Sequence, residues 1–393
     1  MTARRFGIRF STCYALMMLG TGVQLPFLPL WLHARGLSVG QIASVVAGMM
    51  AVRILGAPLF AYAADRSGNR VRVIRACAVS ALVAYCILPF TTEFGLILPV
   101  ALLAGFLFAP VFPLTEGFSV DASAHHGLDY GRIRLWASLS FLAGSSISGA
   151  LLTQISALDT VWLIAGAQSF SVLATFLLPA DPIERAEQHH ATKLEFGQAL
   201  KFLFMSRFTI FLIAASLANA SHGMMYGFST VHWTSLGFST LSIGLLWACA
   251  VLAEVGLFAF SNRVVEKVGP PLLLCLGLAG GVVRWSGMAF ANGMVEMGLL
   301  QALHVVSFAS AHLALMHFIR LHVPLSLRNT AQGLYAALAG GVLLSSATWI
   351  SGPLYGAFGG KAYLAMAILC VFGLGLAIGY ANLSPKVPAQ ADA

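Results

Sequence analysis

The chain has 393 residues, of which 59% are hydrophobic and only 9% are charged. A water-soluble domain carries about 25% charged residues, so this chain cannot cover a water-facing surface and is expected to lie in a bilayer. Its apolar runs are long and do not alternate with polar residues, which excludes a membrane β-barrel and leaves helices as the spanning elements.

A helix needs about 20 apolar residues to cross a bilayer, and twelve stretches are predicted to do so. In chain order they are 7–31, 38–63, 71–91, 94–118, 133–155, 159–178, 207–234, 240–260, 269–290, 294–318, 327–352 and 361–382. One long polar stretch, 180–206, separates the first six from the last six. We therefore predict an all-α integral membrane protein with an N-terminal six-helix bundle at 1–180, a cytoplasmic central loop at 181–206 and a C-terminal six-helix bundle at 207–393.

The positive charges lie on one side of these predicted spans. With the N-terminus in the cytoplasm, 18 of the 22 Lys and Arg residues fall in inside segments, and only Arg35 and Lys361 fall outside. This asymmetry predicts that both termini are cytoplasmic. It also accounts for the net charge of +8 without a nucleic-acid partner. The six Cys residues are scattered, fit no metal or disulfide spacing and give no reason to expect a metal or a cofactor.

A short pattern recurs in the two halves. Trp31-x4-Gly36-Leu-Ser38 precedes the second predicted span, and Trp233-x3-Gly237-Phe-Ser239 precedes the eighth. A shift of 201 residues also places Arg53 on Glu254. Related halves of this kind are typical of transporters that bind substrate between their repeats, near the midplane of the bilayer.

The loop between the second and third spans carries a motif. Within Ala61-Tyr-Ala-Ala-Asp65-Arg66-Ser-Gly68-Asn-Arg70, four positions match the signature G-x-L-A-D-R-x-G-R-K of the major facilitator superfamily, which the segment resembles. The matching residues are Asp65, Arg66, Gly68 and Arg70. The resemblance implies the major facilitator fold. A carboxylate here can cap a neighbouring helix and pair with Arg, which steadies one conformer, so a structural role is expected.

Ionisable residues inside spans are costly and usually functional. At 1.5 Å per residue, Arg284, His222 and His304 each lie about 22 Å from their cytoplasmic ends, so they form a layer near mid-membrane. The planar guanidinium of Arg284 suits a carboxylate, and we expect it to bind a substrate acid. A fixed salt bridge between Arg284 and Glu254, which lies nearer the cytoplasmic side, is the alternative.

Glu116 and Glu254 are candidate proton carriers, because the proton affinity of a carboxyl group changes with burial and with a nearby cation. His312 is a candidate relay; it lies eight residues, about two turns, after His304, so the two share a face. Hydrogen bonding between helices is the alternative for each. In the N-terminal half we expect Arg53 to pair with Glu116.

Aromatic residues of the C-terminal half could wall an apolar pocket beside Arg284. They are Tyr226, Phe228, Trp233, Trp247, Trp285 and Phe308. A cation beside aromatic rings suits a small amphipathic acid. Tyr226 and Trp285 are therefore assigned to the predicted substrate site, and Gln24, one of the few amide side chains in the spans, is added to it.

The string D-Y-G-R-I-R-L-W-A-S, from Asp129 to Ser138, resembles a D-Y-G-x-x-R-L-W-x-S stretch of the phenylpropionate permease family, a branch of the major facilitator superfamily. Further similar stretches surround His222, Glu254, Arg284 and the pair His304 and His312. The resemblance spans nearly the whole chain. It implies a proton-coupled importer of 3-phenylpropionate or a related aromatic acid, multi-pass in a bacterial inner membrane.

Two residues of this stretch, Asp129 and Arg134, are expected to act in the conformational machinery. The chain departs from the family pattern at two places: Glu116 stands where an Asp is expected, and Met225 stands where a Tyr is expected. The second change removes a hydroxyl from the predicted site, so the substrate remains open at this point.

Other functions are compatible with the same composition. A sugar or nucleoside symporter and a drug or metabolite efflux pump are the alternatives within transporters. The sequence lacks H-E-x-x-H, G-x-S-x-G and Walker-type motifs, so neither an intramembrane enzyme nor ATP-driven transport is expected. The expected partners are a small organic molecule, protons and the lipid bilayer, and the protein is expected to act as a monomer.

Overall fold

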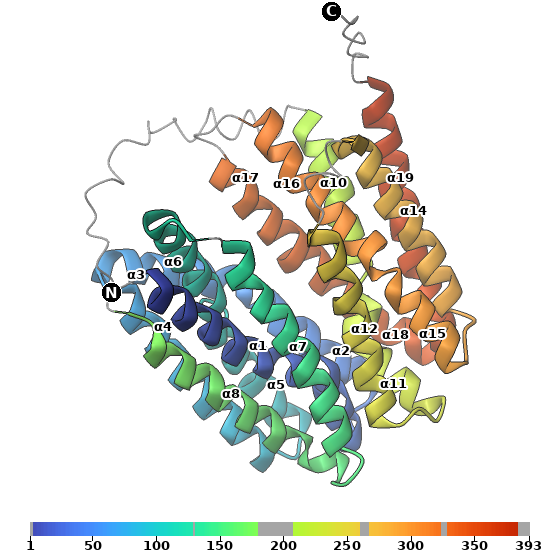
Figure 1. Cartoon of the computed structure of the whole chain (residues 1–393). Coiled ribbons are helices and arrows are strands. Elements are labelled where there is room, and N and C mark those ends of the chain that lie inside the picture. Colours follow the sequence, from blue (N-terminus) through green and yellow to red (C-terminus); the bar gives the residue numbers. More distant parts are fainter. Residues whose placement is uncertain (1–2, 129, 180–206, 260–266, 324–327, 384–393) are drawn as a thin grey trace, which may run out of the picture.

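The structure is a computed structural model that describes residues 3–128, 130–179, 207–259, 267–323 and 328–383. These residues form helices and short connections (Figure 1). The predicted central loop at 181–206 lies outside the described residues, so its boundaries stay a prediction.

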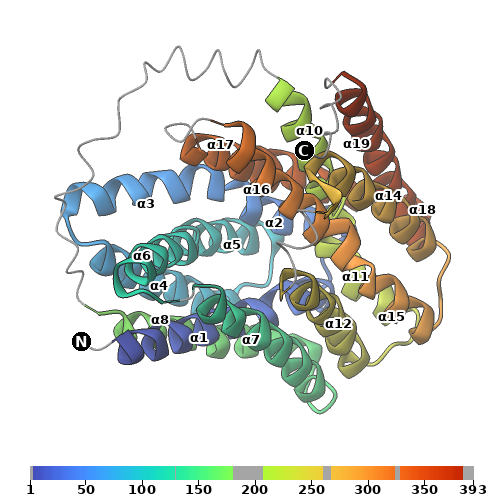
Figure 2. The ribbon, with the colours of Figure 1, turned by 45° about the horizontal axis from the view of Figure 1, so that its top comes forward.

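The helices lie in two groups, side by side (Figures 1 and 2). The first group, the N-half, comprises α1 (Ala3–Ala34), α2 (Val39–Ala51), α3 (Arg53–Ser67), α4 (Arg70–Ile87), α5 (Phe94–Phe108), α6 (Val111–His126), α7 (Tyr130–Leu151) and α8 (Thr160–Leu177). The second group, the C-half, comprises α10 (Arg207–Ala220), α11 (Gly223–Ser235), α12 (Thr240–Ala259), α14 (Pro270–Met288), α15 (Met294–Ala302), α16 (Ser310–His322), α17 (Arg328–Tyr335), α18 (Leu344–Phe358) and α19 (Tyr363–Leu383).

Two spans of the C-half contain π-helical turns. Val305–Ala309 joins α15 to α16, and Ala336–Leu343 joins α17 to α18. Such turns are rare and are frequent at functional sites. The first of them directly follows His304.

Nine helical stretches among the described residues are long and apolar enough to cross a membrane. The predicted membrane protein is therefore confirmed, whereas the predicted number of twelve spans is not established. One of the nine, Ala331–Asn382, holds the two helices α18 and α19, and the apolar helix at Thr240–Gly256 is shorter than a full span.

The repeated pattern found in the sequence forms the same turn twice. Gly36 and Gly237 have φ angles of 81° and 84°, in the left-handed region that glycine adopts most easily. Each is followed two residues later by a serine, Ser38 or Ser239, whose Oγ accepts a hydrogen bond from the backbone N–H three residues on. The serines start α2 and α12, so the two halves begin their second spans alike.

The halves pack closely at the end of the molecule that holds these two turns. Thr240 donates a hydrogen bond from Oγ1 to the carbonyl of Gly149 at 2.8 Å, which joins α12 to α7. At Gly244 the backbone of α12 lies against the carbonyl of Ser145, and a Cβ atom there would overlap it. Glycine thus allows backbone contact between the halves. Toward the opposite end, where α8 ends and α10 begins, the helix axes of the halves diverge (Figure 1).

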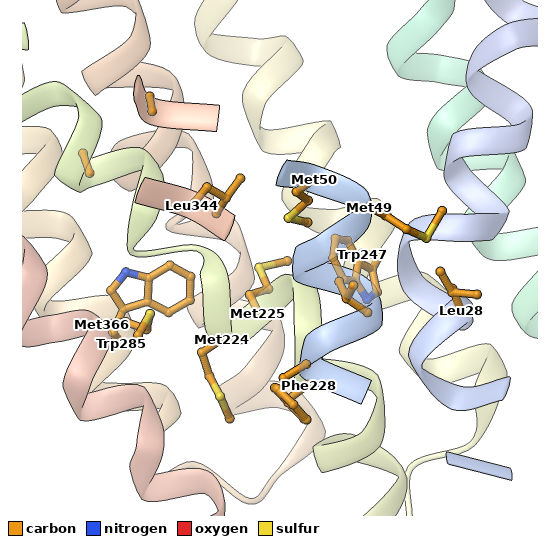
Figure 3. Close-up of a cluster of buried hydrophobic side chains, with 14 of the residues drawn as sticks. Leu28, Met49, Met50, Met224, Met225, Phe228, Trp247, Trp285, Leu344 and Met366 are labelled. Carbon is orange, nitrogen blue, oxygen red and sulfur yellow. The ribbon is translucent and has the colours of Figure 1, made fainter. Parts of the chain in front are cut away.

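Methionine side chains are prominent where the halves face each other. Met49 and Met50 come from α2 of the N-half, and Met224 and Met225 come from α11 of the C-half. Figure 3 shows them with Trp247 of α12 in one buried cluster. Methionine is unbranched and adaptable, so this region of the core can repack when the halves move.

Candidate functional site

Arg284 on α14 is the centre of a buried polar group. Its side chain is fully buried, and its Nη1 atom lies 2.9 Å from Nδ1 of His304, 3.2 Å from Nε2 of His222 and 3.0 Å from Oγ of Ser307. The predicted mid-membrane layer of Arg284, His222 and His304 is therefore one contact group. All four residues belong to the C-half.

The second guanidinium nitrogen has its own partners. Nη2 donates to Oε1 of Gln301 at 2.5 Å and lies 3.2 Å from the sulfur of Met225. The guanidinium carbon is 4.3 Å from the ring centroid of Trp285, whose indole N–H donates to Ser221 at 2.9 Å. A cation over an aromatic face gains electrostatic stabilisation. Trp285 thus lies against the cation, as predicted, with its own polar atom satisfied.

The contacts of Arg284 determine where the protons of two histidines lie. Arginine has only donors, so a ring nitrogen that bonds Arg284 accepts and carries no proton; the shorter contact is with Nδ1 of His304 and the longer with Nε2 of His222. Nδ1 of His222 faces the carbonyls of Ala218 and Asn219 at 3.1 and 3.2 Å, so it carries the ring proton. Both histidines are therefore neutral in this arrangement.

Glu254 on α12 approaches this group through His304. Its Oε2 atom lies 3.9 Å from Nε2 of His304, the ring nitrogen that faces away from Arg284. The alternative predicted from sequence, a direct salt bridge between Arg284 and Glu254, is not among the ion pairs of the described residues. An imidazole stands between the two charges.

The second candidate carboxylate, Glu116 on α6, lies in the N-half beside Arg134 of α7. Nε of Arg134 is 3.5 Å from Oε1 of Glu116, and both side chains are more than a third exposed. The predicted pairing of Glu116 with Arg53 is wrong, because the ion pair that the structure gives Glu116 is with Arg134. Arg53, at the start of α3, instead lies within electrostatic range of Tyr85.

His312 on α16 connects the two halves electrostatically. Its ring stacks on Phe308 at 6.2 Å, and Phe308 stacks on His304 at 5.0 Å, so the three rings form a ladder. His312 also interacts electrostatically with Glu116 and Arg134 of the N-half. The prediction that His304 and His312 share a face is confirmed.

Gln24 is held in a separate polar group. Its Oε1 atom accepts hydrogen bonds from the hydroxyl of Tyr85 at 2.8 Å and from Nε2 of Gln168 at 2.9 Å. These three residues belong to the N-half. The structure therefore does not bring Gln24 into the group around Arg284.

Tyr226 of α11 lies between His222 of the Arg284 group and Trp247 of α12. Its ring is 6.0 Å from that of His222 and stacks on that of Trp247, also at 6.0 Å. It is partly buried, like Glu254. Tyr226 is thus placed where the sequence predicted it, next to the cation group.

The signature segment ends α3 and begins α4. Gly68 has a φ of 70° and closes α3, which fits the left-handed cap that glycine favours. Arg66 is exposed, and the guanidinium of Arg70 lies 4.7 Å from the ring of Phe118 on α6. Asp65 lies in α3, but its side chain is not described, and Asp129 lies outside the described residues. Their predicted structural roles stay predictions.

Sequence reasoning missed Ser307 and gave Gln301 no role at the cation. Both are fully or almost fully buried and both bond Arg284. Their positions, three residues before and after His304, were the available signal, since side chains at such spacing share a helix face. Met225 was noted only as a departure from a family pattern, yet its sulfur touches the guanidinium.

Comparison with known proteins agrees with this fold. The sequence matches the MFS_1 like family over residues 8–366. It is 29% identical over 357 residues to a "probable 3-phenylpropionic acid transporter" of Escherichia coli K12, covering 89% of this chain and 91% of that protein. It is 23% identical to the maltose permease of Geobacillus stearothermophilus, covering 93% of this chain and 92% of the permease.

Among solved structures, the nucleoside transporter NupG superposes with a TM-score of 0.83. The match covers 97% of this chain and all of NupG at 17% identity. At that identity the likeness concerns the fold alone.

Proposed function

Since this chain belongs to the MFS_1 like family of secondary transporters and is not an enzyme, we propose that it takes up a small aromatic or other organic acid, such as 3-phenylpropionate, together with protons. Transport proceeds by alternating access, in which the N-half and the C-half rock around a site near mid-membrane. The relative of E. coli described above supports the choice of acid.

The observation that carries this proposal is a buried cation without a counter-charge. Within the described part of the chain, every contact of Arg284 is neutral: two histidines, a serine, a glutamine, a methionine and a tryptophan. A buried charge without an opposite charge is expensive. A substrate carboxylate would supply the missing charge, with the planar guanidinium as a matching partner. His222, Tyr226, His304 and Trp285 would surround it.

Glu254 is the favoured proton carrier in this mechanism, because it faces Nε2 of His304, on the side of the ring away from Arg284. In neutral His304, Nε2 already carries the ring proton and faces Glu254, so an imidazolium forms only when Nδ1 gives up the hydrogen bond from Arg284 and takes a second proton. That change places positive charge beside Arg284 and favours binding of an anion there. Glu116 with His312 is the second route, since these residues lie within electrostatic range of each other across the halves.

The orientation follows from the charges of the loops. The excess of Lys and Arg on one side supports cytoplasmic N- and C-termini in a bacterial inner membrane. In that orientation, the end at which the halves pack closely, near Gly149 and Gly244, faces outward. The molecule would then be closed to the outside.

The test is uptake of labelled 3-phenylpropionate into proteoliposomes, with and without an inward proton gradient. Accumulation that needs the gradient and is abolished by a protonophore supports the proposal. Uptake that is equal with and without the gradient rules out proton coupling. If active, oriented protein takes up no 3-phenylpropionate or related acid, the substrate is of another class.

A sugar or nucleoside symporter is the second candidate. The observation that favours it is the group of Gln24, Tyr85 and Gln168 in the N-half, whose amide and hydroxyl groups are of the kind that bind substrate hydroxyls. Those groups already satisfy one another. Competition of maltose and of uridine with 3-phenylpropionate in the same vesicles distinguishes the candidates.

A further inference from the structure

Trp247 has a buried polar atom without a partner. The residue is 3% exposed, and its Nε1 is among the buried atoms of the described residues to which the structure gives no hydrogen-bond acceptor. An unpaired N–H is costly in such a place, and an orphan of this kind in a native structure calls for an explanation. In a transporter, an acceptor absent in one step can arrive with the cargo in another.

Trp247 lies where the two halves meet. It belongs to α12 of the C-half, yet its ring is 6.5 Å from that of Phe141 on α7 of the N-half. On the C-half side it stacks on Tyr226 at 6.0 Å, with 17° between the ring planes. Met49 and Met50 of α2 and Met225 of α11 belong to the same buried cluster (Figure 3). Methionine side chains can yield to an incoming ring with little strain.

The same indole is linked to the charged groups. Glu254 follows Trp247 by seven residues, about two turns, so both lie on one face of α12. Gln301 donates from Nε2 to the carbonyl of Leu246 at 3.4 Å and accepts from Arg284. One side chain therefore joins the peptide before Trp247 to the buried cation.

We propose that Trp247 contacts the substrate directly and selects for planar acids. Its indole N–H donates a hydrogen bond to a carboxylate oxygen of the cargo, and its ring packs against the ring of the cargo. This inference rests on the proposed uptake of a small aromatic acid. It adds Trp247, which lies where the two halves meet, to a site whose other residues surround Arg284 inside the C-half.

The experiment compares Trp247→Phe with Trp31→Phe in the purified full chain. Phenylalanine keeps a ring and removes the N–H. Trp31 is a matched control, because it is fully buried on α1 and its Nε1 also has no acceptor among the described residues. Binding of 3-phenylpropionate is measured by calorimetry, and thermal melting reports folding. Trp247→Leu, which removes the same N–H, is used if Trp247→Phe does not fold.

We expect the Trp247 variant to bind 3-phenylpropionate at least about tenfold more weakly, the effect of losing a hydrogen bond to a charged group. Trp31→Phe is expected to bind like the wild type. Equal affinity in both variants overturns the role of Trp247 and leaves the proposed function in place. If the wild type binds no aromatic acid, the proposed function fails, and this inference fails with it.

Discussion

Arg284 donates a hydrogen bond to Nδ1 of His304 at 2.9 Å, and the other nitrogen of that ring faces Glu254 at 3.9 Å. One imidazole therefore separates a buried cation from a carboxylate. A proton at Nδ1 of His304 and a hydrogen bond from Arg284 exclude each other, because arginine cannot accept. This exclusion gives the site a physical basis for linking a proton to an anion.

Replacing Arg284 tests the role of the cation. Arg284→Ala leaves buried neutral acceptors without a donor, so the free energy of unfolding should fall by about 1–3 kcal/mol. Arg284→Lys keeps the charge but loses the planar fork, and affinity for the acid should fall at least about tenfold. Thermal melting in detergent measures the change in stability, and calorimetry measures the change in affinity.

Arg72→Ala, at an exposed position on α4, is the control. Unchanged affinity and transport rate in Arg284→Ala would exclude a substrate role.

Replacing the carboxylates tests the proton carrier. Glu254→Gln keeps the shape of the side chain and cannot release a proton. We expect it to lose accumulation driven by a proton gradient, while exchange of labelled for unlabelled acid across the membrane continues. Glu116→Gln should retain accumulation. If both variants still accumulate acid against its gradient, the proton carrier lies elsewhere.

The ion pair of Glu116 and Arg134 should contribute little to stability. Both side chains are more than a third exposed, and such pairs contribute roughly 0.2–1 kcal/mol. A double-mutant cycle with Glu116→Gln and Arg134→Gln, read by thermal melting, measures the coupling. A coupling energy well above this range would mean that the ion pair is shielded from water in the folded protein.

The close packing of α12 on α7 can be tested at Gly244. A Cβ atom there would meet the carbonyl of Ser145, so Gly244→Ala should cost about 1–3 kcal/mol in the state with this end closed. A cysteine introduced at Ser148, which is buried on α7 near this contact, should then react faster with a thiol reagent added from this end. Gly166→Ala on α8 is the control, since nothing lies within 4 Å of its added Cβ. Equal rates in both variants would contradict the prediction.

Much of the helix framework can be predicted from sequence because its signals are local. Long apolar runs give the helices, and the repeated glycine and serine give the turns before α2 and α12. The shared level of Arg284, His222 and His304 along their helices was also predictable, because an α-helix rises by a constant amount per residue. These three residues do meet.

The partners of polar side chains were less predictable. Depth along a helix says nothing about which way the helix is turned toward its neighbours. Glu116 therefore found Arg134, on the next helix, in place of Arg53. Gln24 was likewise satisfied within the N-half by residues that no local pattern connects to it. Ser307 escaped notice because a lone serine in an apolar span is marked only by its spacing of three residues from His304.

The π-helical turn after His304 sets the register of the rest of the span 294–322. A π turn holds an extra residue compared with an α turn. Each residue of an α-helix advances the chain by about 100° around the axis. If the turn at Val305–Ala309 moved along the chain or relaxed to α-helix, the side chains beyond it would swing round their axis without any tilt of the helix. His312 would then face a different neighbour, and the C-half would have gained a twisting motion beside the rocking of the halves.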